Sequence, residues 1–109
     1  MSSAGIEWVD REGVVEEARG IARRIRSDHP EGERAILFGS FARGRGGPRS
    51  DLDIVLIVTQ TRIPHRERAS VFMPVCTRPI DLFVYTAEEA ARSNVPVLRE
   101  ALEHGIDLL

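Results

Sequence analysis

Three aspartates could do chemistry in this sequence, because each stands inside an otherwise apolar stretch. Asp51 and Asp53 lie one residue apart at the head of the apolar run 52–58, and Asp81 interrupts the apolar run 79–85. Burying a carboxylate without a partner costs several kcal/mol, so something must compensate these charges. A divalent cation does this well, and Mg²⁺ prefers hard oxygen ligands and leaves room for water and phosphate.

The spacing of these acids determines which of them can act together. Side chains of a strand alternate between its faces, so Asp51 and Asp53 point the same way, about 7 Å apart. If the strand that carries Asp81 lies beside theirs, Asp81 can face the pair across the sheet. Three such acids suit two metal ions and a base for an attacking hydroxyl. Arginine could also compensate them, and three are close in sequence: Arg43, Arg45 and Arg49.

A glycine and a serine, Gly39 and Ser40, stand just upstream of the acids, at the end of another apolar run. Glycine lets the backbone approach a ligand closely, and the amides that follow can point toward an anion. The Ser40 hydroxyl can donate a hydrogen bond to a phosphate oxygen. Arg43 and Arg45 flank this pair, where they could contact phosphate or be solvated. A phosphate cradle beside an acidic, metal-binding face predicts a site for a nucleoside triphosphate.

The elements that must position these residues follow from periodicity. Apolar residues recur at helical spacing over 12–27, where Asp10 can cap the helix start. The runs 35–38 and 52–58 are apolar on both faces, which favours buried strands, and the run 52–58 is expected to be central in the sheet. The segment 62–76 is interpreted as a short helix. The expected elements are helix 12–27, strand 35–38, strand 52–58, a helix within 62–76, strand 79–85, a helix from 86 and a helix from 96.

Three further details of these elements can be predicted. Thr86 and Glu89 match a capping box, so a helix should begin at Thr86. Pro96 suits the first turn of the last helix, and Gly105 suits its end. In the segment 62–76 the residues expected to point inward are Val71, Phe72 and Val75. Helices that alternate with buried strands predict an α/β (α+β) fold, a small mixed sheet of about three or four strands flanked by helices.

Bulk properties restrict the classes of function. A chain of 109 residues is most simply one domain, residues 1–109, with 42% hydrophobic and 29% charged residues. The net charge of −2 argues against an extended nucleic-acid surface. The longest apolar run, 54–58, is too short to span a membrane, and the N-terminus lacks the basic-then-apolar pattern of a signal peptide. The one cysteine, Cys76, is expected to be a small buried hydrophobe and suits a cytoplasmic protein.

The order of these motifs resembles a known family. Gly39-Ser40, ten residues, Asp51-Leu52-Asp53 and then a strand with Asp81 resemble the DNA polymerase β-like nucleotidyltransferase superfamily, and most closely its minimal members of MNT type. The resemblance implies the nucleotidyltransferase fold. It also implies that Asp51, Asp53 and Asp81 hold two Mg²⁺ ions, and that Asp81 helps to deprotonate the acceptor. Gly39 and Ser40 would then hold the triphosphate of ATP.

The resemblance also suggests a biological role. MNT proteins of this size resemble antitoxins that adenylylate, and so silence, a ribonuclease of HEPN type in a toxin–antitoxin pair. A chain of this length leaves no room for a second domain that binds an acceptor, so a HEPN-type partner or a homo-oligomer would supply that site. Two alternatives remain open. One is an antitoxin that masks its toxin by binding without catalysis, and the other transfers a nucleotide to a small molecule such as an aminoglycoside.

Overall fold

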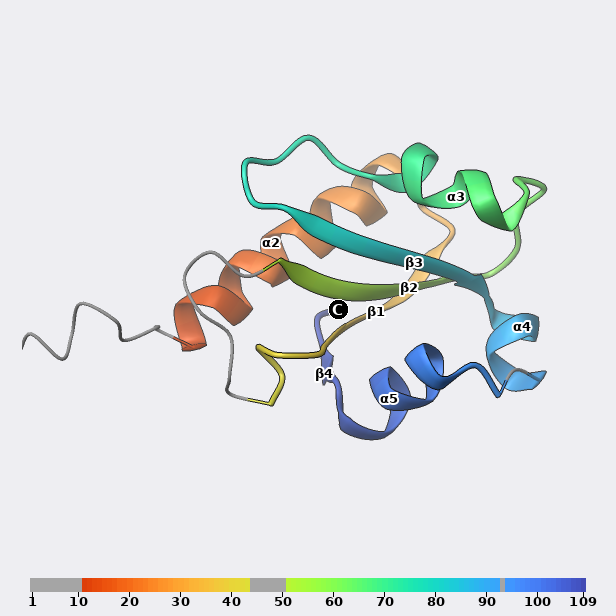
Figure 1. The fold of residues 1–109 in the computed structure, drawn as a ribbon. Coiled ribbons are helices and arrows are strands. Elements are labelled where there is room, and N and C mark those ends of the chain that lie inside the picture. Colours follow the sequence, from red (N-terminus) through yellow and green to blue (C-terminus); the bar gives the residue numbers. More distant parts are fainter. Residues whose placement is uncertain (1–10, 44–50, 93) are drawn as a thin grey trace, which may run out of the picture.

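The structure is a computed structural model that describes residues 11–43, 51–92 and 94–109. Helices and strands alternate along most of the chain (Figure 1). In chain order they are α2 (Arg11–Asp28), β1 (Gly32–Phe38), β2 (Leu52–Val58), α3 (His65–Phe72), β3 (Ile80–Thr86), α4 (Ala87–Arg92), α5 (Pro96–His104) and β4 (Ile106–Asp107). This arrangement confirms the mixed α+β fold and the strand at 52–58.

The strands form one mixed sheet in the order β3-β2-β1-β4. Strand β2 is interior, pairs antiparallel with β1 and parallel with β3, and is apolar because both of its faces are covered. The short strand β4 pairs antiparallel with β1 at the edge of the sheet. Because β2 and β3 run parallel, their first residues lie at the same end of the sheet.

Helices cover both faces of the sheet (Figure 1). Helices α2 and α3 pack on one face, where the buried residues of the helices include Ala18, Ala22, Ile25 and Phe72 and those of β2 include Leu52, Ile54 and Leu56. Helix α5 packs on the other face, against Ile36, Phe38 and Val55, through Leu98 and Ala101. By strand alternation Asp53 and Asp81 belong to this second face. They lie near the first residues of β2 and β3 and are not among the buried residues of that face.

The short helix expected within 62–76 is present, but its inward face is different from the one predicted. Phe72 is buried as expected, whereas Val71 is 46% exposed and Val75 is 87% exposed. The helix ends at Phe72, so Val75 lies in the segment after it. The residue one turn before Phe72, Arg68, shares its face and is buried instead.

The buried guanidinium of Arg68 is accommodated in the interior by several hydrogen bonds to oxygen atoms. It donates to the carbonyl oxygens of Ile63 at 2.9 Å and Val84 at 3.3 Å, and to both carboxylate oxygens of Glu89 at 2.6 and 3.2 Å. Glu89 also completes the predicted capping box, accepting from the Thr86 amide at 2.8 Å while its own amide donates to the Thr86 hydroxyl at 3.1 Å. One carboxylate therefore joins α3, β3 and the start of α4.

Strand β1 begins at Gly32, three residues before the predicted strand 35–38. Other differences from the predicted elements concern the chain ends and one side chain. Helix α5 ends at His104, as Gly105 predicts, and β4 then adds a strand that the sequence did not indicate. Asp10, the expected cap of α2, lies outside the described residues. Cys76 is exposed, so its prediction as a buried hydrophobe was wrong. No helix in the described ranges is both long and apolar enough to cross a bilayer.

Candidate active site

Three strands bring the candidate residues to one end of the sheet. The register pairs Asp53 of β2 with Asp81 of β3 and, on the other side, with Phe38 of β1. Because β1 is antiparallel to β2, its last residue lies beside the first residues of β2 and β3. Gly39 follows Phe38 directly, so the glycine and the two aspartates meet at this end.

Asp53 and Asp81 lie side by side on the face of the sheet that α5 covers. Burial raises the pKa of the Asp53 carboxyl above its ordinary 3.8, and so do the charge of Asp81 and a hydrogen bond with the Asp81 side chain. The charge of Asp51 raises this pKa further. Asp53 is half-buried, while Asp51 and Asp81 are exposed. Two carboxylates this close repel each other, and a bound cation would relieve that repulsion.

Gly39 adopts the left-handed conformation, with φ of 77°, and its backbone abuts the Asp53 side chain. A Cβ at this position would collide with the Asp53 carboxylate, chiefly with Oδ2. Only a residue without a side chain lets the turn come this close to the acid. The glycine thus brings the backbone after β1 into contact with the carboxylate of β2.

We therefore expect Gly39→Ala to move the Asp53 carboxylate and to lower stability. The left-handed conformation alone costs a non-glycine residue roughly 1–2 kcal/mol, and the collision adds to that. Thermal unfolding and Mg-ATP binding measure the two effects. Gly20→Ala is the control, because Gly20 lies in α2 with nothing close to the position of its added Cβ, and it should bind as the original does. Unchanged stability and binding in Gly39→Ala would contradict this account of the turn.

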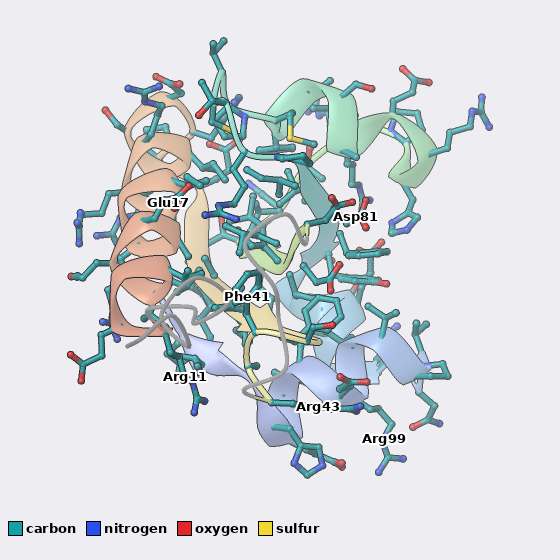
Figure 2. All side chains as sticks on the ribbon, turned by 60° about the vertical axis from the view of Figure 1, so that its left-hand side comes forward. Arg11, Glu17, Phe41, Arg43, Asp81 and Arg99 are labelled. Atoms are coloured by element: carbon teal, nitrogen blue, oxygen red, sulfur yellow. The ribbon has the colours of Figure 1, made fainter. Side chains whose placement is uncertain are left out.

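The turn after β1 is fixed at both ends. The Arg43 amide donates to the Gly39 carbonyl oxygen at 3.1 Å. Phe41 is buried in the core between these residues, which leaves Ser40 exposed. Figure 2 shows Phe41 between α2 and the start of β3, where Asp81 lies. The burial of Phe41 holds the turn against the sheet and leaves Ser40 at the surface.

Arg78 connects this turn to α2, a role that the sequence did not indicate. Its guanidinium lies 5.8 Å from the centre of the Phe41 ring and forms hydrogen bonds of 2.8 and 3.0 Å with the carboxylate of Glu17. This bond with Glu17 raises the pKa of Arg78. Because Asp81 follows three residues after Arg78, the contact ties the start of β3 to the turn. Residues of this kind are found only once the tertiary packing is known.

Helix α5 adds a fourth carboxylate, which the sequence also gave no reason to select. Glu100 is among the charges that raise the pKa of Asp53. Its Oε2 lies 3.0 Å from the Arg43 guanidinium, so one arginine of the turn pairs with the helix. Figure 2 shows Arg43 lying along α5. Arg45 and Arg49, the other arginines considered as partners of the acids, lie outside the described residues.

The donor set suits a hard cation. Asp53 and Asp81 offer adjacent carboxylate oxygens, and Mg²⁺ typically takes one or two carboxylates together with water and phosphate. Burial first, and then the charges of Asp81, Asp51 and Glu100, raise the pKa of Asp53, so several carboxylates act on this point. Across the described ranges, no group of three or more His, Cys, Asp or Glu residues is arranged to hold a metal by itself. A cation here would therefore need ligands from a bound nucleotide or water besides the Asp53–Asp81 pair.

Comparisons with known proteins agree with this geometry. The family model described as nucleotidyltransferase domain matches residues 18–108. A candidate nucleotidyltransferase from Sulfolobus solfataricus is similar in structure, with a TM-score of 0.62 and 22% identity over 89% of this chain and 80% of that one. A comparison with curated proteins finds no match.

Two further solved structures share the fold. A toxin–antitoxin with AMP-PNP has a TM-score of 0.57 and 18% identity, and the match covers 84% of this chain and 72% of that one. A mutant of the toxin–antitoxin MntA–HpeT has a TM-score of 0.54 and 15% identity, over 84% of this chain and 71% of that one. At these identities the likeness establishes the fold.

Proposed function

Because this chain belongs to the nucleotidyltransferase domain family, we propose that it is an Mg²⁺-dependent enzyme that moves AMP from ATP to an acceptor hydroxyl. The acceptor is a hydroxyl of a partner protein, and the chain acts as the antitoxin of a toxin–antitoxin pair whose toxin is of HEPN type. The site residues are Asp51, Asp53, Asp81, Gly39 and Ser40. The protein works in the cytoplasm, where ATP and Mg²⁺ are available.

The pairing of Asp53 with Asp81 supports this proposal more than any other observation. A structural role would give each buried or half-buried carboxylate a cationic partner. Among the side chains of the described residues, the one that most raises the pKa of Asp53 is another carboxylate, Asp81, and the turn at Gly39 comes close to the same side chain. Such an arrangement lowers stability and is explained by a ligand that the two acids share. An aspartate pair beside a glycine turn suits a nucleotide with its cation.

The reaction forms one bond and breaks one bond at the α-phosphorus of ATP. The acceptor oxygen attacks this phosphorus, the bond to the β-phosphate oxygen breaks, and pyrophosphate leaves with that electron pair. Asp81 takes the acceptor proton, because its carboxylate is exposed and can reach an incoming group. Amides of the turn at Gly39 and the Ser40 hydroxyl hold the triphosphate in line. Asp51, Asp53 and Asp81, together with oxygen atoms of water and of the bound nucleotide, would hold Mg²⁺, which would stabilise charge on the attacking and leaving oxygens.

The choice of a protein acceptor rests on the structural neighbours. Two of them are toxin–antitoxin assemblies, and one of these was solved with the ATP analogue AMP-PNP. A fold that occurs in such assemblies makes a partner protein the first acceptor to test. The alternatives, masking without catalysis and transfer to an aminoglycoside, make different predictions in the experiments that follow.

The direct test mixes the chain with Mg-ATP and the protein encoded by the neighbouring gene, and measures intact masses. The proposal predicts that the partner gains one or more adenylyl groups while the enzyme does not. Omission of Mg²⁺, or Asp53→Asn in the enzyme, should leave the partner unmodified. A partner that stays unmodified under every condition, although the two proteins form a complex, would overturn the proposal of a protein acceptor.

A cell-protection assay separates catalysis from masking. A variant with Asn in place of Asp51, Asp53 and Asp81 is expected to bind the toxin and yet fail to protect cells. Full protection by this variant would favour stoichiometric masking. Release of pyrophosphate with an aminoglycoside and not with the partner protein would favour a small-molecule acceptor.

A further inference from the structure

The pair formed by Arg43 and Glu100 has no evident structural purpose. The side chains of Arg43 and Glu100 are 50% and 30% exposed, and ion pairs at such exposure contribute little to stability. Glu100 also adds a negative charge near Asp53, whose pKa the charges of Asp81 and Asp51 already raise. Because Glu100 contributes little to stability and repels Asp53, its effect on Arg43 is the better explanation of its position.

The backbone of Arg43 is fixed by the turn at Gly39, but its side chain is long and flexible. Without a fixed partner, its guanidinium could turn onto the carboxylates of Asp53 and Asp81, where it would compete with a cation. Glu100, on a helix that is packed against the sheet through Leu98, offers a rigid partner at 3.0 Å. The guanidinium is therefore held on the α5 side of the site (Figure 2). This position keeps the positive charge of Arg43 paired with α5 while its backbone stays in the Gly39 turn.

We infer that Arg43 contacts the triphosphate of the bound nucleotide and that Glu100 is a positioning residue that holds the Arg43 guanidinium ready for this contact. The inference rests on the proposed function, since it requires a nucleoside triphosphate at the Gly39 turn. A guanidinium presents several N–H donors in a fixed plane, which suits two phosphate oxygens at once. It can keep Glu100 on one edge while it binds phosphate on another. The charge that develops on pyrophosphate as it leaves is thereby offset.

Charge alone and positioning predict opposite results for Glu100→Gln. Removing a negative charge close to the binding site of an anion should strengthen Mg-ATP binding if Glu100 acts only through its field. If Glu100 positions Arg43, the same substitution should weaken binding by roughly three- to tenfold, because the guanidinium loses its fixed orientation. Arg43→Gln should weaken binding by roughly 10- to 100-fold, since it removes the contact itself. Calorimetric titration with Mg-ATP measures each value.

The double variant tests whether the two residues act through one another. In the Arg43→Gln background, Glu100→Gln should cause no further loss, because Arg43 is no longer there to be positioned. Arg43→Lys should recover part of the affinity in the presence of Glu100, because it restores the charge without the planar fork. Independent, additive losses in the double variant would overturn the positioning role.

A matched control lies on the same helix. Arg99 and Glu103 also form an ion pair at 3.0 Å, and both side chains are exposed on α5. Glu103→Gln and Arg99→Gln make the same charge changes and should bind Mg-ATP as the original chain does. If the original chain and both controls bind while Glu100→Gln binds equally or more tightly, the inference is wrong and the proposed function stands. If the original chain does not bind Mg-ATP, the proposed function itself fails.

Discussion

Asp53→Asn is expected to reduce nucleotidyl transfer by roughly a thousandfold or more, the largest effect of any single substitution in this chain. Asparagine has the shape of aspartate but carries no charge, so it holds a divalent cation beside Asp81 far less tightly. Release of pyrophosphate from Mg-ATP in the presence of the partner protein measures the loss. The matched control is Asp107→Asn in β4, an aspartate that pairs with Arg34 at 3.0 Å and lies outside the site. A small loss in Asp53→Asn would contradict the role given to this residue.

The same substitution should leave stability unchanged or raise it at neutral pH when no Mg²⁺ is added. The pKa of Asp53 is raised in the folded chain, first by burial and then by Asp81. The folded state therefore binds the Asp53 proton more tightly than the unfolded state does. The stabilisation from this proton is complete below the pKa of the unfolded state, and it is lost as pH rises through the pKa of the folded state. Asparagine never ionises, so it avoids this loss. At pH 7 the unfolding temperature of Asp53→Asn should be equal to or higher than that of the original chain, and the difference should shrink near pH 4.

Glu89→Ala is expected to cause the largest loss of stability. It leaves the buried Arg68 without its carboxylate and removes one half of the capping box at Thr86. Breaking a buried ion pair by removing one partner costs about 3–5 kcal/mol, and the 40% exposure of the Glu89 side chain reduces this to about 2–3 kcal/mol. Thermal unfolding should then shift downward by about 10 °C.

The neighbouring residue provides the control for this prediction. Glu88 pairs with Arg92 at 3.6 Å in an exposed position, so Glu88→Ala should change stability by less than about 0.5 kcal/mol. The two variants should also differ in their response to acid. The hydrogen bond from Arg68 lowers the pKa of Glu89, so its stabilisation is present above the unfolded pKa and is lost as pH falls through the folded value. Equal stability in the two alanine variants at pH 7 would contradict the role of the Arg68–Glu89 pair.

The sequence was sufficient for the elements whose signals are local. The strand at 52–58 follows from a run that is apolar except at Asp53. The capping box at Thr86 is present with both hydrogen bonds, and the helix begins one residue after the predicted start, at Ala87. The end of α5 at Gly105 is also local. Asp81 could be assigned to a strand, because a single acid in an apolar run still alternates with its neighbours. Its exact partner, Asp53, depends on the register between two strands and could not be derived from either one.

The features that were missed depend on packing between distant segments. Val71 was expected to point inward because it is apolar, yet the short helix α3 buries only one stripe, and Arg68 occupies it through a carboxylate 21 positions away. Glu100 has no local signal, because its place beside Arg43 depends on how α5 packs on the sheet. Arg78 likewise became informative only when its contacts with Glu17 and Phe41 were known.

A titration with Mn²⁺, a paramagnetic probe used in place of Mg²⁺, tests whether Asp53 and Asp81 bind one cation next to the turn at Gly39. Electron paramagnetic resonance counts the free ion while ATP is present at a fixed concentration. The original chain and Asp107→Asn should both take up Mn²⁺ beyond what ATP binds alone, and a double variant with Asn at positions 53 and 81 should take up none. Uptake by the double variant equal to that of the original chain would show that these carboxylates are not the ligands.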